Sequence, residues 1–381
     1  MQKRSLLKLA LLLASPLPLA ACGDKGEPAP AGAAKPAAAP ADAAAAEGPL
    51  KVAFVYISPV SEEGWSSRHD QARRELEAHF GDKIQVKAID NVPDNADAER
   101  VLRDLCEQGY KLIFATSFGY MNGAHKVAKD FPDVKFEHCT GYKTADNFSY
   151  YNARFYQARY LAGKLAASMS KDGHLGYVAA VPIPEVLQGI NAFTLGAKSV
   201  NPNVEVRVVW TSAWYDPAKE GDAAKSLIGQ RCDVITHHTN STAVAAACED
   251  AKIPVISYNS AMKKAAPTML LAGVVHFWDT YYQKRIQDVL DGTWKPEPVW
   301  GGAPEHMIDV IEVSKDADPE AVKQMRDVYA KMEKREFHPF TGPIVTNDGR
   351  EVIPAGKTAT DQELLSMEWF VQGVTAKLPT A

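Results

Sequence analysis

The chain has 381 residues, with 47 acidic and 42 basic side chains and a formal net charge of -5 at pH 7. This acidic balance argues against binding of nucleic acid through a broad basic surface. After the N-terminal segment, no apolar run reaches the length that a membrane-spanning helix needs. The roughly 330 residues from Lys51 onward are enough for two hydrophobic cores.

The N-terminal segment predicts export. Its first eight residues carry three cations, and an apolar run extends from Leu6 to Leu13. A basic start, a short apolar run and small residues after it are typical of a secretory signal. The run Leu19-Ala20-Ala21-Cys22 resembles a bacterial lipobox, whose cysteine is lipidated and becomes the mature N-terminus. We expect residues 1–21 to be a lipoprotein signal peptide and Cys22 to anchor the exported chain to a membrane facing the periplasm. The alternative is an ordinary signal peptide with a chance cysteine.

Residues 22–49 are rich in alanine and proline and have almost no large apolar side chains. Such a segment cannot bury enough apolar surface to offset the entropy of ordering. The repeated prolines favour an extended, semi-rigid spacer over an alanine-rich helix. We therefore expect a tether between the lipidated cysteine and a globular body.

Short apolar segments of strand length alternate with segments of helical periodicity from residue 51 to residue 139. The expected strands are 51–57, 84–89, 111–116 and 134–139, and the expected helices are 65–80, 96–108 and 120–130. This alternation is typical of a parallel sheet that helices cover on both faces.

The same alternation restarts near residue 156. The expected strands are 174–179, 204–211, 233–237, 254–258 and 270–275, and the expected helices are 156–169, 184–200, 218–229, a segment ending at 250, and 279–290. A hairpin is expected to turn at Asp348-Gly349. The sequence thus predicts an α/β protein of two doubly wound lobes joined by a hinge. The N-terminal lobe comprises residues 50–155 plus 258–305, and the C-terminal lobe comprises 156–257 plus 306–381.

Aromatic and amide side chains follow most of the expected strands. Ligands of open parallel sheets bind beyond the carboxyl ends of the strands, so two facing sheets form a cleft lined by these residues. The candidates are Trp65, Phe118, Gly119, Tyr120, Asn122, Arg154, Phe155, Trp214, Asn240, Tyr258, Asn259 and Trp278. Each aromatic taken alone is more often a packing residue. Their recurrence at one end of the strands favours a flat ligand with polar edges.

The chemistry of these candidates suits a nucleobase. Stacking of an aromatic side chain on a base contributes about 1–3 kcal/mol to the binding free energy. An asparagine can both donate a hydrogen bond to the edge of adenine and accept one from it. A phosphate-binding glycine loop is absent from the sequence, which argues against a triphosphate.

Several segments carry a resemblance to a known family. They are EGWSSRHD (63–70), ATSFGYMN (115–122), ARFYQARYLAG (153–163), PEVLQGINAFTLGA (184–197), WYDPAKE (214–220), DGTWK (291–295) and HPFTGPI (338–344). The chain resembles the basic membrane protein family of ABC-transporter substrate-binding lipoproteins, which are similar to purine nucleoside receptors. The resemblance implies a type I periplasmic-binding-protein fold, a monomer without cofactor or metal, and ABC permease subunits as partners. It also implies a purine held between Trp65 and Trp214.

The chain departs from its relatives at three positions. Asn122, Asn240 and Asn259 stand where relatives often carry acids, and the acid at the last of these positions addresses a ribose. These amides favour a free purine base, with adenine first, over a nucleoside. A nucleoside, riboflavin or a sensing role without transport remain the alternatives.

An enzyme is the less favoured class. The ten histidines show no metal-binding spacing of the His-Glu-x-x-His kind, and there is no Gly-x-Ser-x-Gly elbow. His237 and His238 are adjacent, so in a strand they point to opposite faces. Arg154 could either reach a ligand or brace the hinge.

The cysteines leave two alternatives open. Four remain besides Cys22, and they allow three pairings. Cys232 and Cys248 flank one strand–helix unit, where they could form a disulfide or stay as free buried thiols.

Overall fold

The computed structural model of the chain describes residues 48–61 and 63–378. The chain divides into two units, Met1–Ala45 and Ala46–Ala381, and all described residues belong to the second. The expected signal peptide, the lipidated Cys22 and the tether as far as residue 47 lie outside the described residues. Within the described part of the chain, no helix is both long and apolar enough to cross a membrane.

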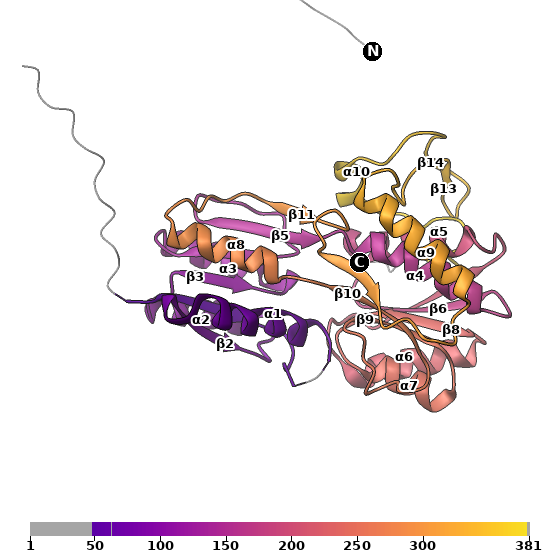
Figure 1. The fold of residues 1–381 in the computed structure, drawn as a ribbon, viewed down its shortest axis with the longest axis horizontal. Helices are drawn as coiled ribbons and strands as arrows, with labels where there is room; N and C mark the ends of the chain where they lie inside the picture. Colours follow the sequence, from indigo (N-terminus) through magenta and orange to yellow (C-terminus); the bar gives the residue numbers. More distant parts are fainter. Residues whose placement is uncertain (1–47, 62, 379–381) are drawn as a thin grey trace, which may run out of the picture. The chain divides into compact units, whose positions relative to one another are not determined.

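The first lobe is built on a six-stranded parallel sheet with the strand order β11-β5-β4-β3-β1-β2 (Figure 1). The strands are β1 (Leu50–Val55), β2 (Ile84–Ile89), β3 (Leu112–Ala115), β4 (Lys135–Cys139), β5 (Phe148–Ala153) and β11 (Val299–Gly301). Its helices are α1 (Trp65–Phe80), α2 (Ala96–Glu107), α3 (Met121–Asp130) and α8 (Asp279–Leu290), with short 3-10 turns at η1 (Gly81–Lys83) and η2 (Phe118–Tyr120).

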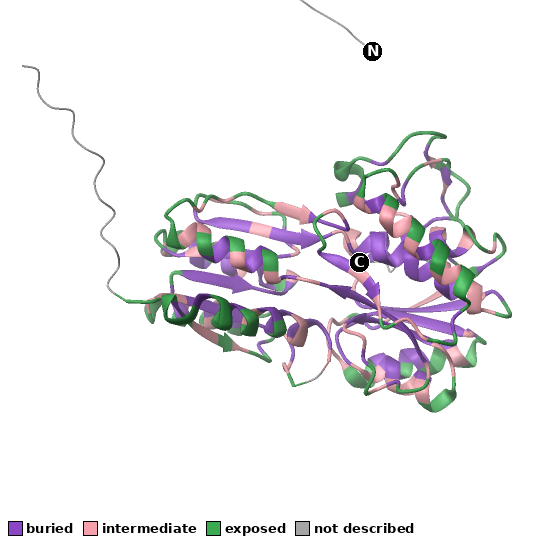
Figure 2. Ribbon diagram, in the orientation of Figure 1, coloured by how far each residue is buried: buried purple, intermediate pink, exposed green. Residues whose placement is uncertain are grey.

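The apolar run of β1 serves two cores because successive side chains of a strand point to opposite faces. Val52 and Phe54 belong to the core that contains side chains of α1 and α8. Ala53 and Val55 belong to a second core with side chains of α2 and α3. Figure 2 shows the central strands of both sheets buried, whereas the helices alternate between buried and exposed residues.

The second lobe has a six-stranded sheet with the order β12-β10-β9-β8-β6-β7, in which only β12 runs antiparallel to its neighbour. The strands are β6 (His174–Ala179), β7 (Glu205–Trp210), β8 (Val234–His238), β9 (Val255–Asn259), β10 (Leu270–His276) and β12 (Ile308–Ile311). Its helices are α4 (Phe155–Met169), α5 (Pro184–Lys198), α6 (Pro217–Gly229), α7 (Ala243–Ala251) and α9 (Pro319–Glu333).

Helices α4 and α5 pack unusually close together because each carries a glycine at the contact. A Cβ atom on Gly163 would lie 1.9 Å from the carbonyl oxygen of Phe193, and one on Gly196 would lie 1.9 Å from that of Tyr160. Only a residue without a side chain allows this approach. This pairing places the first turn of α5 beside the crossing between the lobes.

The C-terminal segment packs on α5. It contains the expected hairpin, formed by β13 (Ile344–Val345) and β14 (Glu351–Ile353), and the short helix α10 (Asp361–Leu365). Gly349 takes a φ of 88°, which the expected turn requires. Side-chain amides of α5 hold the segment: Gln188 donates to the Leu364 carbonyl at 2.8 Å, and Asn191 donates to the Trp369 carbonyl at 2.8 Å.

The predicted boundary between the lobes at residue 258 is wrong. We expected residues 258–305 in the N-terminal lobe, but β10 pairs with β9 and β12 in the second sheet. The chain returns to the first lobe only after His276, where α8 begins the stretch that ends with β11. Within the described residues it crosses between the lobes after β5, after β10 and after β11.

Of the two alternatives left open for Cys232 and Cys248, the structure shows free thiols and not a disulfide. They lie in one hydrophobic cluster, where each is almost fully buried. Burial raises the pKa of Cys232 to about 11 and that of Cys248 to about 12, which keeps both protonated. They act as small apolar core residues.

Candidate functional site

A cavity lies between the two lobes, where the carboxyl ends of both sheets meet. Its lining residues are Ile57, Trp65, Ser117, Phe118, Thr140, Glu185, Trp214, His238, Asn240 and Tyr258. About 320 Å³ between these residues is free of protein atoms, but the centre of a water molecule can reach only about 20 Å³ of it. Because one water needs roughly 10–15 Å³ by this measure, a ring-sized ligand enters only when the walls separate.

Trp65 forms part of the wall from the first lobe. It is the first residue of α1, and its indole Nε1 donates to the Thr116 carbonyl oxygen at 2.6 Å. The Trp65 ring lies edge-on to the rings of His69 and His276, with distances of 4.5 Å and 4.8 Å between the ring centres. These contacts fix its orientation and leave 7% of the residue exposed.

At Gly64, just before Trp65, the backbone of the first lobe comes close to that of the second. It has a φ of 155°, and a Cβ on it would lie 2.3 Å from the Asn240 carbonyl oxygen of the second lobe. The Gly64 carbonyl accepts a hydrogen bond from Ser260 Oγ at 3.2 Å. Arg68, one turn further along α1, donates to the His276 carbonyl at 2.6 Å.

Trp214 forms part of the opposite wall. It lies half-buried in the loop between β7 and α6. The loop ends at Asp216, whose side chain caps α6 by accepting a hydrogen bond from the Lys219 amide at 3.1 Å. The Trp214 carbonyl accepts from the Asn240 amide at 2.9 Å, which joins this loop to the loop after β8. Trp65 and Trp214 thus contribute one indole from each lobe to the same cavity.

The polar part of the cavity contains a buried carboxyl. Glu185 Oε2 accepts from Asn152 Nδ2 at 2.8 Å, and burial raises the pKa of Glu185 to about 7. His238 Nε2 lies 3.7 Å from Glu185 Oε1, and burial lowers the pKa of His238 well below its usual value. Among the described residues that line this cavity, none is a lysine or an arginine. The site therefore suits a neutral ligand with hydrogen-bond donors.

Asn240 is supported from behind by a buried amide. Asn259 Nδ2 lies 3.4 Å from Asn240 Oδ1, and Asn259 Oδ1 lies 3.2 Å from His276 Nε2. Asn259 is fully buried and does not line the cavity. It positions Asn240 and does not reach the cavity itself.

Three predicted aromatic residues lie in the core. Trp278 is fully buried and stacks on His69 at 5.0 Å with an interplanar angle of 7°. Phe155 packs edge-on against Tyr258 at 5.9 Å and is 2% exposed. Tyr120 donates its hydroxyl hydrogen to the Val92 carbonyl and belongs to the core under α2 and α3. None of the three lines the cavity.

Gly119 and Asn122 are also outside the cavity lining. Gly119 is exposed, and a Cβ there would collide with the Asp94 carboxyl. Asn122 is exposed, and its Oδ1 accepts from Lys143 Nζ at 2.6 Å. The amide at position 122 therefore gives no information about a ribose in this cavity.

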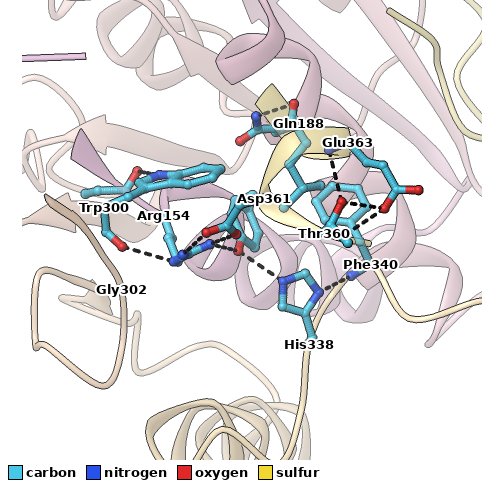
Figure 3. Close-up of polar contacts among 12 residues, drawn as sticks. Arg154, Gln188, Trp300, Gly302, His338, Phe340, Thr360, Asp361 and Glu363 are labelled. Atoms are coloured by element: carbon cyan, nitrogen blue, oxygen red, sulfur yellow. Dashed lines mark hydrogen bonds and ion pairs between the residues drawn. The ribbon is translucent and has the colours of Figure 1, made fainter. Parts of the chain in front are cut away.

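Arg154 braces the crossing between the lobes, as Figure 3 shows. Its guanidinium makes two hydrogen bonds of 2.7 Å with the Asp361 carboxylate and lies 4.3 Å from the centre of the Trp300 ring. The guanidinium also donates to the Tyr156 hydroxyl at 3.0 Å, which lies 3.1 Å from His338 Nε2. Arg154 does not line the cavity, so the structure favours the hinge role over a ligand contact.

Five predicted residues come together in the cavity: Trp65, Phe118, Trp214, Asn240 and Tyr258. The other five lining residues were not among the candidates: Ile57, Ser117, Thr140, Glu185 and His238. Of these, Glu185 and Thr140 come after β6 and β4. These were strand ends without a conspicuous aromatic residue, although Glu185 lies in a segment that carries the family resemblance. A search of every strand end for polar residues would have found both.

Comparison with known proteins identifies the family. The profile described as "ABC transporter substrate-binding protein PnrA-like" matches residues 50–337. A purine-binding protein of Brucella abortus is 51% identical over 338 residues, which cover 88% of this chain and 96% of the relative. A protein of Haloferax volcanii whose name gives glucose as the ligand of an ABC transporter is 34% identical over 87% of this chain and 82% of the relative.

Solved structures agree on the fold. An ABC transporter solute-binding protein from Conexibacter woesei superposes with a TM-score of 0.62 at 19% identity, over 76% of this chain and 98% of that protein. Another solute-binding protein, from Aeropyrum pernix, superposes with a TM-score of 0.66 at 16% identity, over 83% of this chain and 97% of that protein. Two parallel-sheet lobes with this likeness define the type I periplasmic-binding-protein fold. The chain belongs to the family of PnrA-like ABC transporter substrate-binding proteins.

Proposed function

We propose that the chain captures a free purine base, with adenine preferred, between Trp65 and Trp214 and delivers it to an ABC permease. As a substrate-binding protein of an ABC transporter, it acts outside the cytoplasm on a small-molecule ligand and is not an enzyme. The observation that carries the proposal is one indole from each lobe at a single narrow cavity. Indole faces suit a flat ring on which both lobes can close.

The polar groups at the cavity support a neutral base. Asn240 offers an amide that can donate and accept, and its neighbour Asn259 is an amide rather than an acid. Without a cation among the described lining residues, a phosphate would find no charged partner there. The relative from Brucella abortus, which is named for purine binding, points to the same ligand class.

We further propose that Cys22 carries a lipid and that residues 22–49 tether the binding unit to the membrane. The support is the lipobox-like sequence before Cys22. A tether raises the concentration of the binding protein near its permease. We propose that the protein works as a monomer, because residues of one chain line the cavity on both sides.

Isothermal titration calorimetry on the mature chain tests the ligand class. The panel contains adenine, guanine, hypoxanthine, adenosine, riboflavin and glucose. We expect adenine to bind most tightly and adenosine at least about tenfold more weakly, since the cavity is narrow and amides stand at positions 240 and 259. If adenosine bound more tightly than every free base, or if only glucose bound, the proposal would be wrong.

A further inference from the structure

We propose that Glu185 determines specificity by accepting a hydrogen bond from the imidazole-ring N–H of a free purine. That hydrogen is the one that a sugar replaces in a nucleoside. The inference rests on the proposed function and names the group that would distinguish a base from its nucleoside. It concerns a residue that the sequence did not single out.

The position of Glu185 is fixed from both lobes. It lies in the first turn of α5, which Pro184 begins, and its side chain lines the cavity and is 13% exposed. Asn152 of β5 in the first lobe donates to its Oε2 at 2.8 Å. The Asn152 amide is itself oriented, because its Oδ1 accepts from the Ala153 amide at 2.7 Å. This contact leaves the other carboxyl oxygen available at the cavity.

Oε1 of Glu185 can accept a further hydrogen bond. A carboxylate offers about four acceptor sites, and among the described residues the hydrogen bond from Asn152 is the only one to this carboxyl. His238 Nε2 is the nearby nitrogen, but at 3.7 Å it is too far for a hydrogen bond. A largely buried carboxyl with one partner gains from a further donor. The ligand is the group that can bring one.

The buried cation Arg159 does not pair with this carboxyl. Arg159 is fully buried, donates to Thr236 Oγ1 at 3.1 Å and to the His237 carbonyl at 2.7 Å, and lies 3.9 Å from the centre of the Tyr258 ring. Its guanidinium therefore stays behind the aromatic ring. An N–H donor of the ligand, and not an anionic group, complements Glu185.

The two polar ends of the cavity can then divide the purine between them. The amide of Asn240 can serve the amino group of adenine and the adjacent ring nitrogen. The carboxyl of Glu185 is left for the ring N–H. In adenosine this nitrogen carries the sugar and has no hydrogen to donate to Oε1.

The protonation of Glu185 supplies a second readout. Burial raises its pKa to about 7, so the carboxyl is partly protonated at neutral pH. A donor on the ligand favours the ionised form, lowers the pKa and releases a proton on binding. Burial lowers the pKa of the neighbouring His238 and raises the pKa values of Tyr258, Tyr177 and Cys139. These four groups therefore do not change charge between pH 6 and 8.

The test measures the affinities of adenine and 9-methyladenine for the wild-type chain and for Glu185→Gln. The wild type should prefer adenine by roughly tenfold to a hundredfold, the range expected for a hydrogen bond to a charged group. In Glu185→Gln this preference should fall by at least about fivefold. Exposed Glu351→Gln on β14 serves as the charge control and should leave the preference unchanged.

Comparing the two ligands in the two proteins shows whether the preference for adenine comes from a hydrogen bond or from a steric clash with the methyl group. If the methyl group only clashes, the preference for adenine is the same in both proteins and the inference is wrong. Calorimetry of the wild type in two buffers of different ionisation enthalpy gives an answer without a variant. Adenine should release protons near pH 7, and no release would also contradict the inference. If adenine does not bind at all, the proposed function fails together with it.

Discussion

At the scale of single residues, the two tryptophans of the cavity are held in different ways. The Trp65 ring is fixed by its hydrogen bond to Thr116 and by the rings around it. Trp214 is half-buried in a loop that is attached through its backbone carbonyl to Asn240. The first indole is thus a rigid platform, and the second belongs to a loop of the other lobe that can close over a ligand.

Removal of the second indole should weaken binding strongly. We expect Trp214→Ala to raise the dissociation constant for adenine by about tenfold to a hundredfold, because base stacking contributes roughly 1–3 kcal/mol. Trp214→Phe keeps an aromatic face and should raise this dissociation constant much less. Tryptophan fluorescence or calorimetry measures both variants. An unchanged constant for Trp214→Ala would place the ligand elsewhere.

About half of the candidate site could be predicted from the sequence. Trp65, Trp214 and Asn240 lie between the end of a strand and the first turn of the next helix, and the end of a parallel strand is where ligands bind. Phe155 and Trp278 follow strands as well, yet they point into the core. The sequence does not specify which way a side chain points once the regular alternation of a strand has ended.

At the scale of elements, the contact between α4 and α5 depends on its two glycines. We expect Gly163→Ala to lower the free energy of unfolding by about 1–3 kcal/mol or more, because its Cβ would lie 1.9 Å from the Phe193 carbonyl. Gly221→Ala in α6 is the matched control. Its Cβ would meet Ala243 only at 3.9 Å, so better helix propensity should stabilise by about 0.5–1 kcal/mol. Urea unfolding compares them, and equal effects would contradict the packing described here.

The C-terminal segment is the partner of Arg154 at the crossing between the lobes. It begins beyond residue 337, where the match to the family profile ends, and it supplies Asp361. Arg154→Ala should lower the free energy of unfolding by about 1–2 kcal/mol, since it loses both the Asp361 pair and its contact with Trp300. Asp361→Asn should cost less, about 0.5–1 kcal/mol, because that side chain is 56% exposed.

The same variant decides between the two roles considered for Arg154. Adenine affinity of Arg154→Ala should stay within about threefold of the wild type, because Arg154 does not line the cavity. A loss of affinity well beyond that, with stability unchanged, would assign Arg154 to the ligand instead.

Most helices and strands could be located from sequence patterns, but the helices α9 and α10 and three strands were not among the expected elements. The long apolar run that predicts β1 has no counterpart in β5, where Ser149 and Asn152 interrupt the pattern. β11 and β12 are three and four residues long, too short for a clear alternation. Strand pairing is harder still, since the apolar run of β10 does not reveal that its neighbours are β9 and β12.

At the scale of the whole molecule, contacts between the lobes surround the cavity. Arg68 and Ser260 join α1 to the second lobe, and Asn152 joins Glu185 to the first. A ligand that touches both walls adds to these contacts and shifts the equilibrium toward the closed form. The alternation of strands and helices was sufficient to predict two α/β lobes. The position of the second crossing was not predictable, because it depends on which sheet completes the hydrogen bonds of β10.

The central claim is that a purine base is the cargo of this cavity. Native mass spectrometry of the mature protein, purified from the cells that produce it without added ligand, tests this most directly. A bound small molecule with the mass of a free purine base, which disappears in Trp214→Ala, is the result predicted. Retention of a nucleoside, riboflavin or a sugar, with no purine base among the bound species, would contradict the account.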